Sequence, residues 1–267
     1  MYNPFSLHYL FERKKFDNYW FDVATPQFLR HFLEVNNYDL KALRLDEGSF
    51  IANSLRTLSI DSLRPDLELG PLLFQAGYLT ISSYDKETNS YSLESPNREV
   101  KESYAILLMA TLAHTNESII NKAIRPIRNA LLTNDMNELC LQLRIIFAQI
   151  PYHITEHNEN FYHALVQSFF HLLGFESQSE IVTNRGRIDM VVFTKKFTYV
   201  FEFKVKKEPN VKNSPEEAAA QIEDRMYYER YLTSSNAEKK STIVIVGLTF
   251  SKIPSEPSVA CDTRILS

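Results

Sequence analysis

The segment from Arg185 to Lys204 constrains the fold more than any other, because it places charged residues inside an apolar β-hairpin. Its composition, rich in β-branched and aromatic residues, predicts two strands at Arg187–Phe193 and Thr198–Val205. Successive side chains of a strand point to opposite faces, so Glu202 and Lys204 share a face. On the neighbouring strand, Arg187 and Asp189 share a face for the same reason. The chain must therefore place several charges on an apolar sheet.

These charges have two interpretations, since a charge in apolar surroundings is costly unless it is solvated, paired or bound to a metal. The first is the solvent face of an antiparallel hairpin. The second is a metal site, in which Asp189 and Glu202 supply oxygen ligands for Mg²⁺ and Lys204 supplies a cation for a phosphate. Val191 and Val200 share the faces of the charged residues, and apolar side chains fill the opposite face (Phe201, Phe203 and Val205). This pattern weakens the first interpretation, but spacing alone leaves both open.

Charge and composition limit the function classes. The formal net charge of −4 argues against a general polyanion binder. The segment from Arg185 to Lys212 nevertheless holds eight Lys or Arg and three acids, so it is either a solvated surface or a phosphate-facing patch. No apolar run approaches the ~20 residues of a membrane span. Cys140 and Cys261 lie far apart in sequence and suggest neither a zinc pair nor a disulfide framework, which favours a reducing cytoplasm.

Residues 1–150 are predicted to be mainly helical. Thr25-Pro26 is a helix start signal, and three later segments are expected to be helices: 104–111, 119–132 with an interruption at Pro126, and 136–148. Between them, a helix at Leu67–Ala76 and a hairpin formed by 78–84 and 91–94 give the outline of a winged helix. That helix is poor in base-reading side chains, which favours packing over DNA reading. We expect a domain boundary near residue 150.

Residues 151–267 are predicted to be an α/β domain. A helix starts near Asn158 and stops at Gly174, and a strand follows at 177–182. After the charged hairpin, Ser214-Pro215-Glu216-Glu217 is a capping box that opens a helix to about Leu232. Thr242–Thr249 is a continuous apolar run, typical of a buried strand. Together these elements predict a mixed sheet with helices on both sides.

The spacing of Asp189, twelve residues, and then Glu202-Phe203-Lys204 resembles the core of the PD-(D/E)XK nuclease superfamily. The resemblance extends to ENFYH (159–163), LLGF (172–175), GRID (186–189), AxxQI (218–222) and VGLTFS (246–251). These motifs are similar to the nuclease-type domain at the C-terminus of bacterial AAA-ATPase-like proteins. YNPFS (2–6), NYWF (18–21), TPxFL (25–29) and LFQAGYLTI (73–81) resemble the segment that precedes this domain.

The resemblance implies a restriction-endonuclease-like fold and metal-dependent hydrolysis of nucleic acid, with DNA as the expected substrate. Asp189 and Glu202 would bind Mg²⁺ or Mn²⁺, with the carbonyl of Phe203 as a further ligand. Lys204 would be the catalytic cation. Two more residues, Glu159 and Gln221, would assist the site. Three others would contact nucleic acid: Arg187, Arg225 and Tyr228. For Gln221, the alternative of an exposed helix residue with no role in the site is equally open.

Two departures from the family pattern matter. Ile188 stands where the superfamily often has Pro, which is not a ligand. No segment resembles G-x-x-x-x-G-K-[ST], so we expect no nucleotide hydrolysis from this chain and consider an ATPase partner or a missing ATPase domain. Two alternatives therefore stay open. One is a catalytically inactive nuclease-fold module in an AAA-ATPase-like system, and the other is DNA recognition by the winged helix without cleavage.

One further motif is set aside. His153-Ile-Thr-Glu156-His157 fits the H-x-x-E-H pattern of one metalloprotease group, which requires a helix. Here the motif lies between the helix breaker Pro151 and the helix start at Asn158, so we do not expect a zinc hydrolase.

Overall fold

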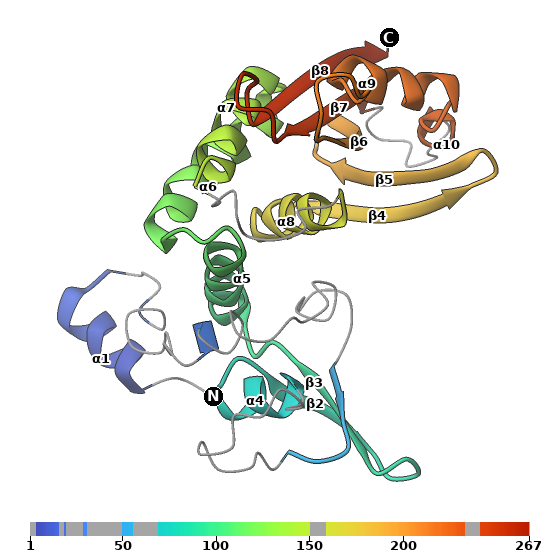
Figure 1. Cartoon of the computed structure of the whole chain (residues 1–267). Coiled ribbons are helices and arrows are strands. Elements are labelled where there is room, and N and C mark those ends of the chain that lie inside the picture. Colours follow the sequence, from blue (N-terminus) through green and yellow to red (C-terminus); the bar gives the residue numbers. More distant parts are fainter. Residues whose placement is uncertain are drawn as a thin grey trace. The chain divides into compact units, whose positions relative to one another are not determined.

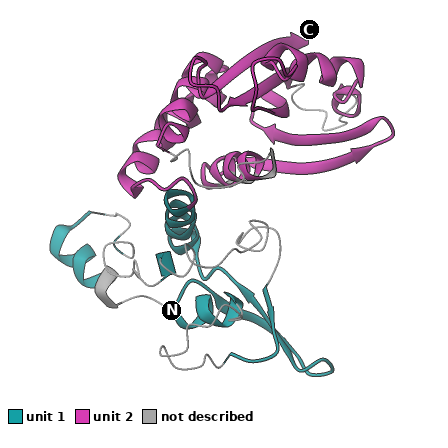
Figure 2. Ribbon diagram, in the orientation of Figure 1, with its two compact units in different colours: residues 1–111 teal, residues 112–267 magenta. Residues whose placement is uncertain are grey.

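The computed structural model describes residues 4–15, 19, 29–30, 50–55, 69–149, 159–232 and 241–266. The helix start at Thr25-Pro26 and the H-x-x-E-H motif lie outside these residues. The chain forms two compact units, Met1–Thr111 and Leu112–Ser267 (Figure 2). In the described part of the chain, no helix is both long enough and apolar enough to cross a membrane.

Unit 1 contains a three-stranded antiparallel sheet of order β1-β3-β2 and three helices among its described residues. The predicted helix and hairpin are both present, as α4 (Leu69–Gln75) followed by β2 (Thr80–Asp85) and β3 (Ser90–Glu94). The carboxylate of Asp85 accepts a 2.8 Å hydrogen bond from the amide of Glu87, which closes the hairpin turn. The remaining elements are α1 (Pro4–Arg13), β1 (Phe50–Ala52) and α5 (Arg98–Leu112). A role of this hairpin in DNA binding stays a prediction.

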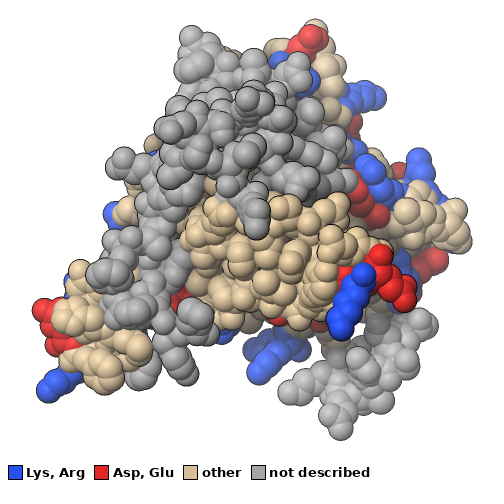
Figure 3. Space-filling model, turned by 90° about the horizontal axis from the view of Figure 1, so that it is seen from below, with Lys and Arg blue, Asp and Glu red and all other residues tan. Residues whose placement is uncertain are grey.

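Charged side chains are mixed on the face of the molecule seen from below. Lys and Arg lie beside Asp and Glu around a central area of other residues (Figure 3). The described residues visible on that face therefore form no continuous basic surface.

Unit 2 is built on a five-stranded mixed sheet of order β4-β5-β6-β7-β8 (Figure 1). β6 and β7 pair in parallel, and every other neighbouring pair is antiparallel. The strands are β4 (Glu176–Thr183), β5 (Gly186–Phe193), β6 (Phe197–Lys206), β7 (Thr242–Ser251) and β8 (Val259–Leu266). The helices are α6 (Glu117–Thr133), α7 (Met136–Phe147), α8 (Glu159–Leu172), α9 (Pro215–Asp224) and α10 (Glu229–Leu232). This is the predicted mixed sheet flanked by helices.

The two faces of the sheet are covered by different helices, because alternate residues of each strand point to opposite sides. On one face, Phe201 packs against Phe170 of α8, with ring centroids 5.3 Å apart. On the other face, Val200 belongs to a buried cluster that includes Ala219 and Ile222 of α9. The predicted division of β6 into two apolar faces is therefore confirmed.

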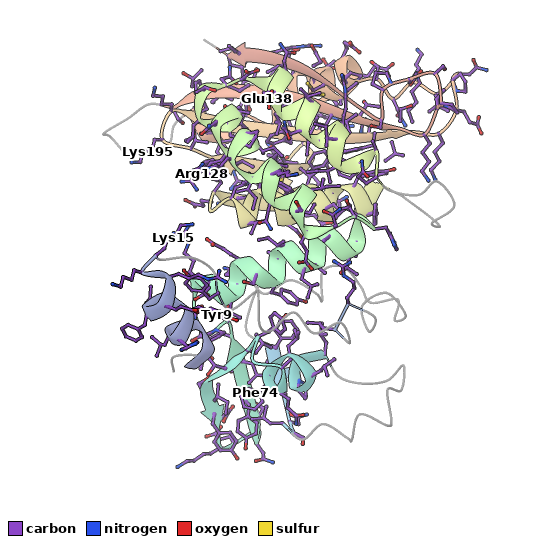
Figure 4. All side chains as sticks on the ribbon, turned by 90° about the vertical axis from the view of Figure 1, so that its left-hand side faces the viewer. Tyr9, Lys15, Phe74, Arg128, Glu138 and Lys195 are labelled. Carbon is purple, nitrogen blue, oxygen red and sulfur yellow. The ribbon has the colours of Figure 1, made fainter. Side chains whose placement is uncertain are left out.

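Helices α6 and α7 also pack on the sheet of unit 2. The hydroxyl of Tyr199 on β6 donates a 2.7 Å hydrogen bond to the carbonyl of Leu131 on α6. Arg128, labelled in Figure 4, donates to the carbonyl of Leu173 at 2.8 Å. The division into compact units falls between Thr111 and Leu112, so these contacts of α6 lie within unit 2. The domain boundary near residue 150 stays a prediction.

Two predicted helices differ in detail from the structure. The capping box of Ser214 and Glu217 is present at the start of α9, as predicted. The helix does not continue to Leu232, because Met226 adopts a left-handed backbone with φ 48° and divides it into α9 and α10. Conversely, α6 runs through Pro126 without the predicted interruption.

Candidate active site

The charged residues lie where the pairing between β5 and β6 ends. The β5–β6 ladder covers Met190–Phe193, whereas the β4–β5 ladder continues to Gly186, so the hairpin of β4 and β5 extends past β6 (Figure 1). Opposite this point on β4, Glu180 adopts a left-handed backbone with φ 50°. Asp189 is the β5 residue next to the end of the β5–β6 ladder. Its carboxylate Oδ2 accepts a 2.8 Å hydrogen bond from the backbone N–H of Phe203.

Glu202 receives hydrogen bonds from two other residues of the site. Its Oε1 accepts a 3.0 Å bond from Nζ of Lys204, two residues along β6. The same oxygen accepts a bond from Nε2 of Gln221, on the helix α9. Gln221 is therefore a neighbour of the site, and the alternative of an exposed helix residue does not hold.

Burial excludes the solvent-face interpretation of these charged residues. The exposed fractions are 7% for Asp189 and 3% for Glu202, and Val191 and Val200 beside them are completely buried. The face is not a solvent face, because α9 covers it. The glycine at 247 makes this close approach possible: a Cβ there would meet the carbonyl of Pro215 and would lie 2.6 Å from the amide of Ala219.

The other predicted residues are distributed around this centre. Glu159 is the first residue of α8. Arg187 forms an ion pair with Glu180 on β4 at 3.7 Å, and its side chain is 55% exposed. Arg225 caps the C-terminus of α9, and Tyr228 packs on the edge of the apolar cluster below α9. The structure thus brings together Asp189, Glu202, Phe203, Lys204 and Gln221, and places Arg187, Arg225 and Tyr228 along the neighbouring hairpin and helix end.

Sequence reasoning did not anticipate how the tip of the β4–β5 hairpin is held. Nη1 of Arg225 donates a 2.6 Å hydrogen bond to the carbonyl of Arg185, and Nη2 of Arg185 lies 3.5 Å from a carboxylate oxygen of Glu229. Gly186 has φ 144°, and a Cβ there would collide with the hydroxyl of Tyr227. A glycine directly before a predicted strand is a signal that could have indicated this close approach.

The donor set suits a hard divalent cation. Two carboxylates and a backbone carbonyl are oxygen ligands of the kind that Mg²⁺ and Mn²⁺ prefer, with waters completing the coordination. Among the described residues, no group of three or more His, Cys, Asp or Glu side chains could hold a metal ion. A metal here would consequently depend on two carboxylates together with backbone and water oxygens.

Comparison with known proteins agrees with this geometry. Residues 157–253 match the family model of the PD-(D/E)XK nuclease superfamily. Over 265 residues, the chain is 31% identical to a protein of Azotobacter chroococcum mcd 1 described as an uncharacterized protein in the vnfD 5′ region. The alignment covers 94% of this chain and 47% of that protein, so the chain spans about half the length of this curated relative. No solved structure matches the chain significantly.

Proposed function

We propose that unit 2, whose residues 157–253 belong to the PD-(D/E)XK nuclease superfamily, catalyses metal-dependent hydrolysis of phosphodiester bonds in nucleic acid. The observation that carries this proposal is the arrangement of the charged residues at one point of the sheet. Asp189 contacts the backbone of Phe203, and Glu202 is bonded to Lys204 and Gln221. Rigid strands and a helix thus hold two carboxylates and a cation in a water-poor place.

Each residue has a role in this reaction. Asp189, Glu202 and the carbonyl of Phe203 would hold Mg²⁺ or Mn²⁺. When bound, such an ion polarises the phosphate and lowers the pKa of an attacking water. Lys204 places a positive charge where negative charge develops on the phosphate. Gln221 holds the orientation of the Glu202 carboxylate. Glu159, the first residue of α8, would help to hold a metal-bound water with its carboxylate.

The proposed substrate is DNA, contacted by the exposed residues beside the site. The side chain of Arg187 is more than half exposed, and Arg225 lies at the end of α9, one turn after Gln221. Tyr228 lies in the segment that joins α9 to α10. In the proposal, Arg187 and Arg225 contact the phosphate backbone, and the chain works with an AAA-ATPase-like partner or domain.

A catalytically inactive module is the rival function, and one observation favours it. Both carboxylates already accept hydrogen bonds from protein groups, Asp189 from Phe203 and Glu202 from Lys204. An ion pair of this kind can be purely structural. Calorimetric titration with Mg²⁺ or Mn²⁺ separates the two functions, because a nuclease binds the metal in a Glu202-dependent manner and a structural pair does not.

Cleavage of DNA tests the proposal directly. The wild-type chain should cleave DNA only with Mg²⁺ or Mn²⁺ present, and Asp189→Asn should reduce the rate by about a hundredfold or more. Glu256→Gln is the matched control, because Glu256 pairs with Lys206 at 2.7 Å in the same unit but lies outside the proposed site. Equal cleavage by the wild type and Asp189→Asn would contradict the proposal.

A further inference from the structure

A pocket lies beside the candidate site, between the turn that joins β4 to β5 and the link that joins α9 to α10. Its volume is about 290 Å³. Two residues at the end of β4 and five around the α9–α10 link line it: Thr183, Asn184, Arg225, Met226, Tyr227, Glu229 and Arg230. The hydrogen bond from Arg225 to the carbonyl of Arg185 joins its two walls. The pocket thus lies next to the first residue of β5, the strand that carries Asp189, and at the C-terminus of α9, the helix that carries Gln221.

Positive charge predominates around this pocket. The guanidinium groups of Arg225 and Arg230 line it, and Arg185 stands next to it in the turn. The carboxylate of Glu229 lies 3.5 Å from Nη2 of Arg185, so one arginine offsets the acid. Three guanidinium groups against one carboxylate favour an anionic ligand, and guanidinium groups bind phosphate in a bidentate manner.

The size and lining of the pocket point to more than a phosphate. A volume of about 290 Å³ lies near the lower end of the range of small-molecule sites. The exposed side chain of Asn184 can both donate and accept hydrogen bonds, as recognition of a base edge requires. A base can also stack on the plane of an arginine such as Arg230. Phosphate-binding and base-binding groups are therefore combined in one place.

The pocket lies close to the proposed reaction centre, both along β5 and along α9. Gly186 precedes Asp189 by three residues on β5, a distance of about 10 Å at the rise of a strand. Arg225 follows Gln221 by four residues, or about one helical turn of ~6 Å. A short stretch of one nucleic acid strand can span such distances.

From these observations, which rest on the proposed nuclease function, we infer that the pocket binds one nucleotide with an unpaired base. The substrate is then a single-stranded region of nucleic acid. A base inside a duplex is stacked and paired and cannot enter a pocket without unstacking, which costs a few kcal/mol. The pocket would hold one nucleotide of the strand while a neighbouring phosphodiester reaches Lys204.

Binding measured without metal tests the inference independently of cleavage. Fluorescence anisotropy of a labelled single-stranded DNA, and of its duplex, would be measured with the whole chain in EDTA. We expect tighter binding of the single strand, and a loss of about tenfold or more in Arg230→Glu. Asn184→Ala, which keeps the charge, should lose about threefold because one base contact disappears.

Lys195→Glu is the matched control for the change of charge. Lys195, labelled in Figure 4, is exposed in the turn between β5 and β6. This turn follows the last residue of β5, whereas the pocket lies beside the first. This variant should bind the single strand within twofold of the wild type. Equal losses in Arg230→Glu and Lys195→Glu would overturn the inference, since they would indicate a general effect of charge. Tighter binding of the duplex, or no binding by the wild type, would overturn it as well.

The same experiments separate this inference from the proposed function. Single-strand binding that depends on Arg230, together with no metal-dependent cleavage, would support the pocket and contradict the nuclease. Cleavage that depends on Asp189, together with unchanged binding in Arg230→Glu, would support the nuclease and overturn the pocket.

Discussion

The backbone N–H of Phe203 donates a 2.8 Å hydrogen bond to the carboxylate of Asp189, at the point where the ladder between β5 and β6 ends. The Asp189 side chain thus accepts the hydrogen bond that a backbone carbonyl of β5 would accept if the ladder continued. The contact fixes Asp189 against the peptide that follows Glu202. Because the acceptor is also a proposed metal ligand, substitutions of Asp189 can test the stability of the bond and the proposed activity separately.

The first prediction concerns this bond. Asp189→Ala should destabilise the chain by about 1–3 kcal/mol, because it removes the acceptor of a buried amide. Asp189→Asn keeps an oxygen at the same position and should cost less than half as much. Urea unfolding of the two variants measures the difference. Equal stability of the variants would show that the bond contributes nothing.

The second prediction compares two lysine–glutamate pairs of β6. Lys204→Met removes the cation beside Glu202, whose side chain is 3% exposed, and should cost on the order of 2 kcal/mol. Lys206→Met breaks a similar pair with Glu256, which is 31% exposed, and should cost clearly less than Lys204→Met, because solvent screens the exposed pair.

A double variant completes that comparison. Glu202→Gln combined with Lys204→Met removes both charges of this pair and should recover most of the lost stability, although not the activity. Thermal unfolding would measure it. A double variant as unstable as the sum of the single variants would contradict the coupling.

The third prediction concerns the contact of α9 with β7 at Gly247. Gly247→Ala should destabilise the chain by roughly 3 kcal/mol and reduce cleavage, because a Cβ would push backbone atoms of α9, and with them Gln221, away from β7. Gly70→Ala is the matched control, since the nearest atoms to its Cβ would be 3.6 Å away, an ordinary contact. Chemical denaturation should show no loss in Gly70→Ala. A similar loss in both variants would indicate that the close approach at Gly247 is not the cause.

The fourth prediction concerns pH. Cys140 on α7 and Cys261 on β8 are free thiols, and their Sγ atoms donate hydrogen bonds to the carbonyls of Val259 and Met136. The interaction of Cys140 with the Cys261 thiol, with help from the nearby Arg144, lowers the pKa of Cys140 to about 7. The same interaction and burial raise the pKa of Cys261 above its usual range. The folded pair therefore loses one proton near pH 7 and keeps the other.

The sign of the effect follows from the unfolded state, in which both thiols titrate near 9.0. Between about pH 7 and 9 the unfolded chain binds more protons, so the contribution of the pair to stability rises with pH. Above pH 9 the folded chain binds more protons and the contribution falls. Unfolding in reducing buffer should reveal this maximum, and Cys140→Ser should abolish it. An unchanged pH profile in Cys140→Ser would contradict the prediction.

Local patterns predicted much of unit 2. The alternation of Val200, Phe201 and Glu202 follows from the period of a strand, and the capping box at Ser214 follows from hydrogen bonding within one turn. Neither depends on distant residues. The strand β8 (Val259–Leu266) was not predicted, because its residues alternate weakly and it is held at the sheet edge by pairing with β7. The three-residue β1 was missed because it is too short to show a period.

The site divides in the same way. The local pattern alone places Asp189 on one strand and puts Glu202 and Lys204 on one face of the next, because each relation spans a few residues of regular backbone. The burial of this face depends on tertiary packing, because the covering helix α9 packs there through Gly247. The tertiary structure also decided that Gln221 reaches Glu202 and that Arg225 holds the hairpin tip. These contacts join segments far apart in the chain, and the packing of whole elements, not a local period, sets their distances.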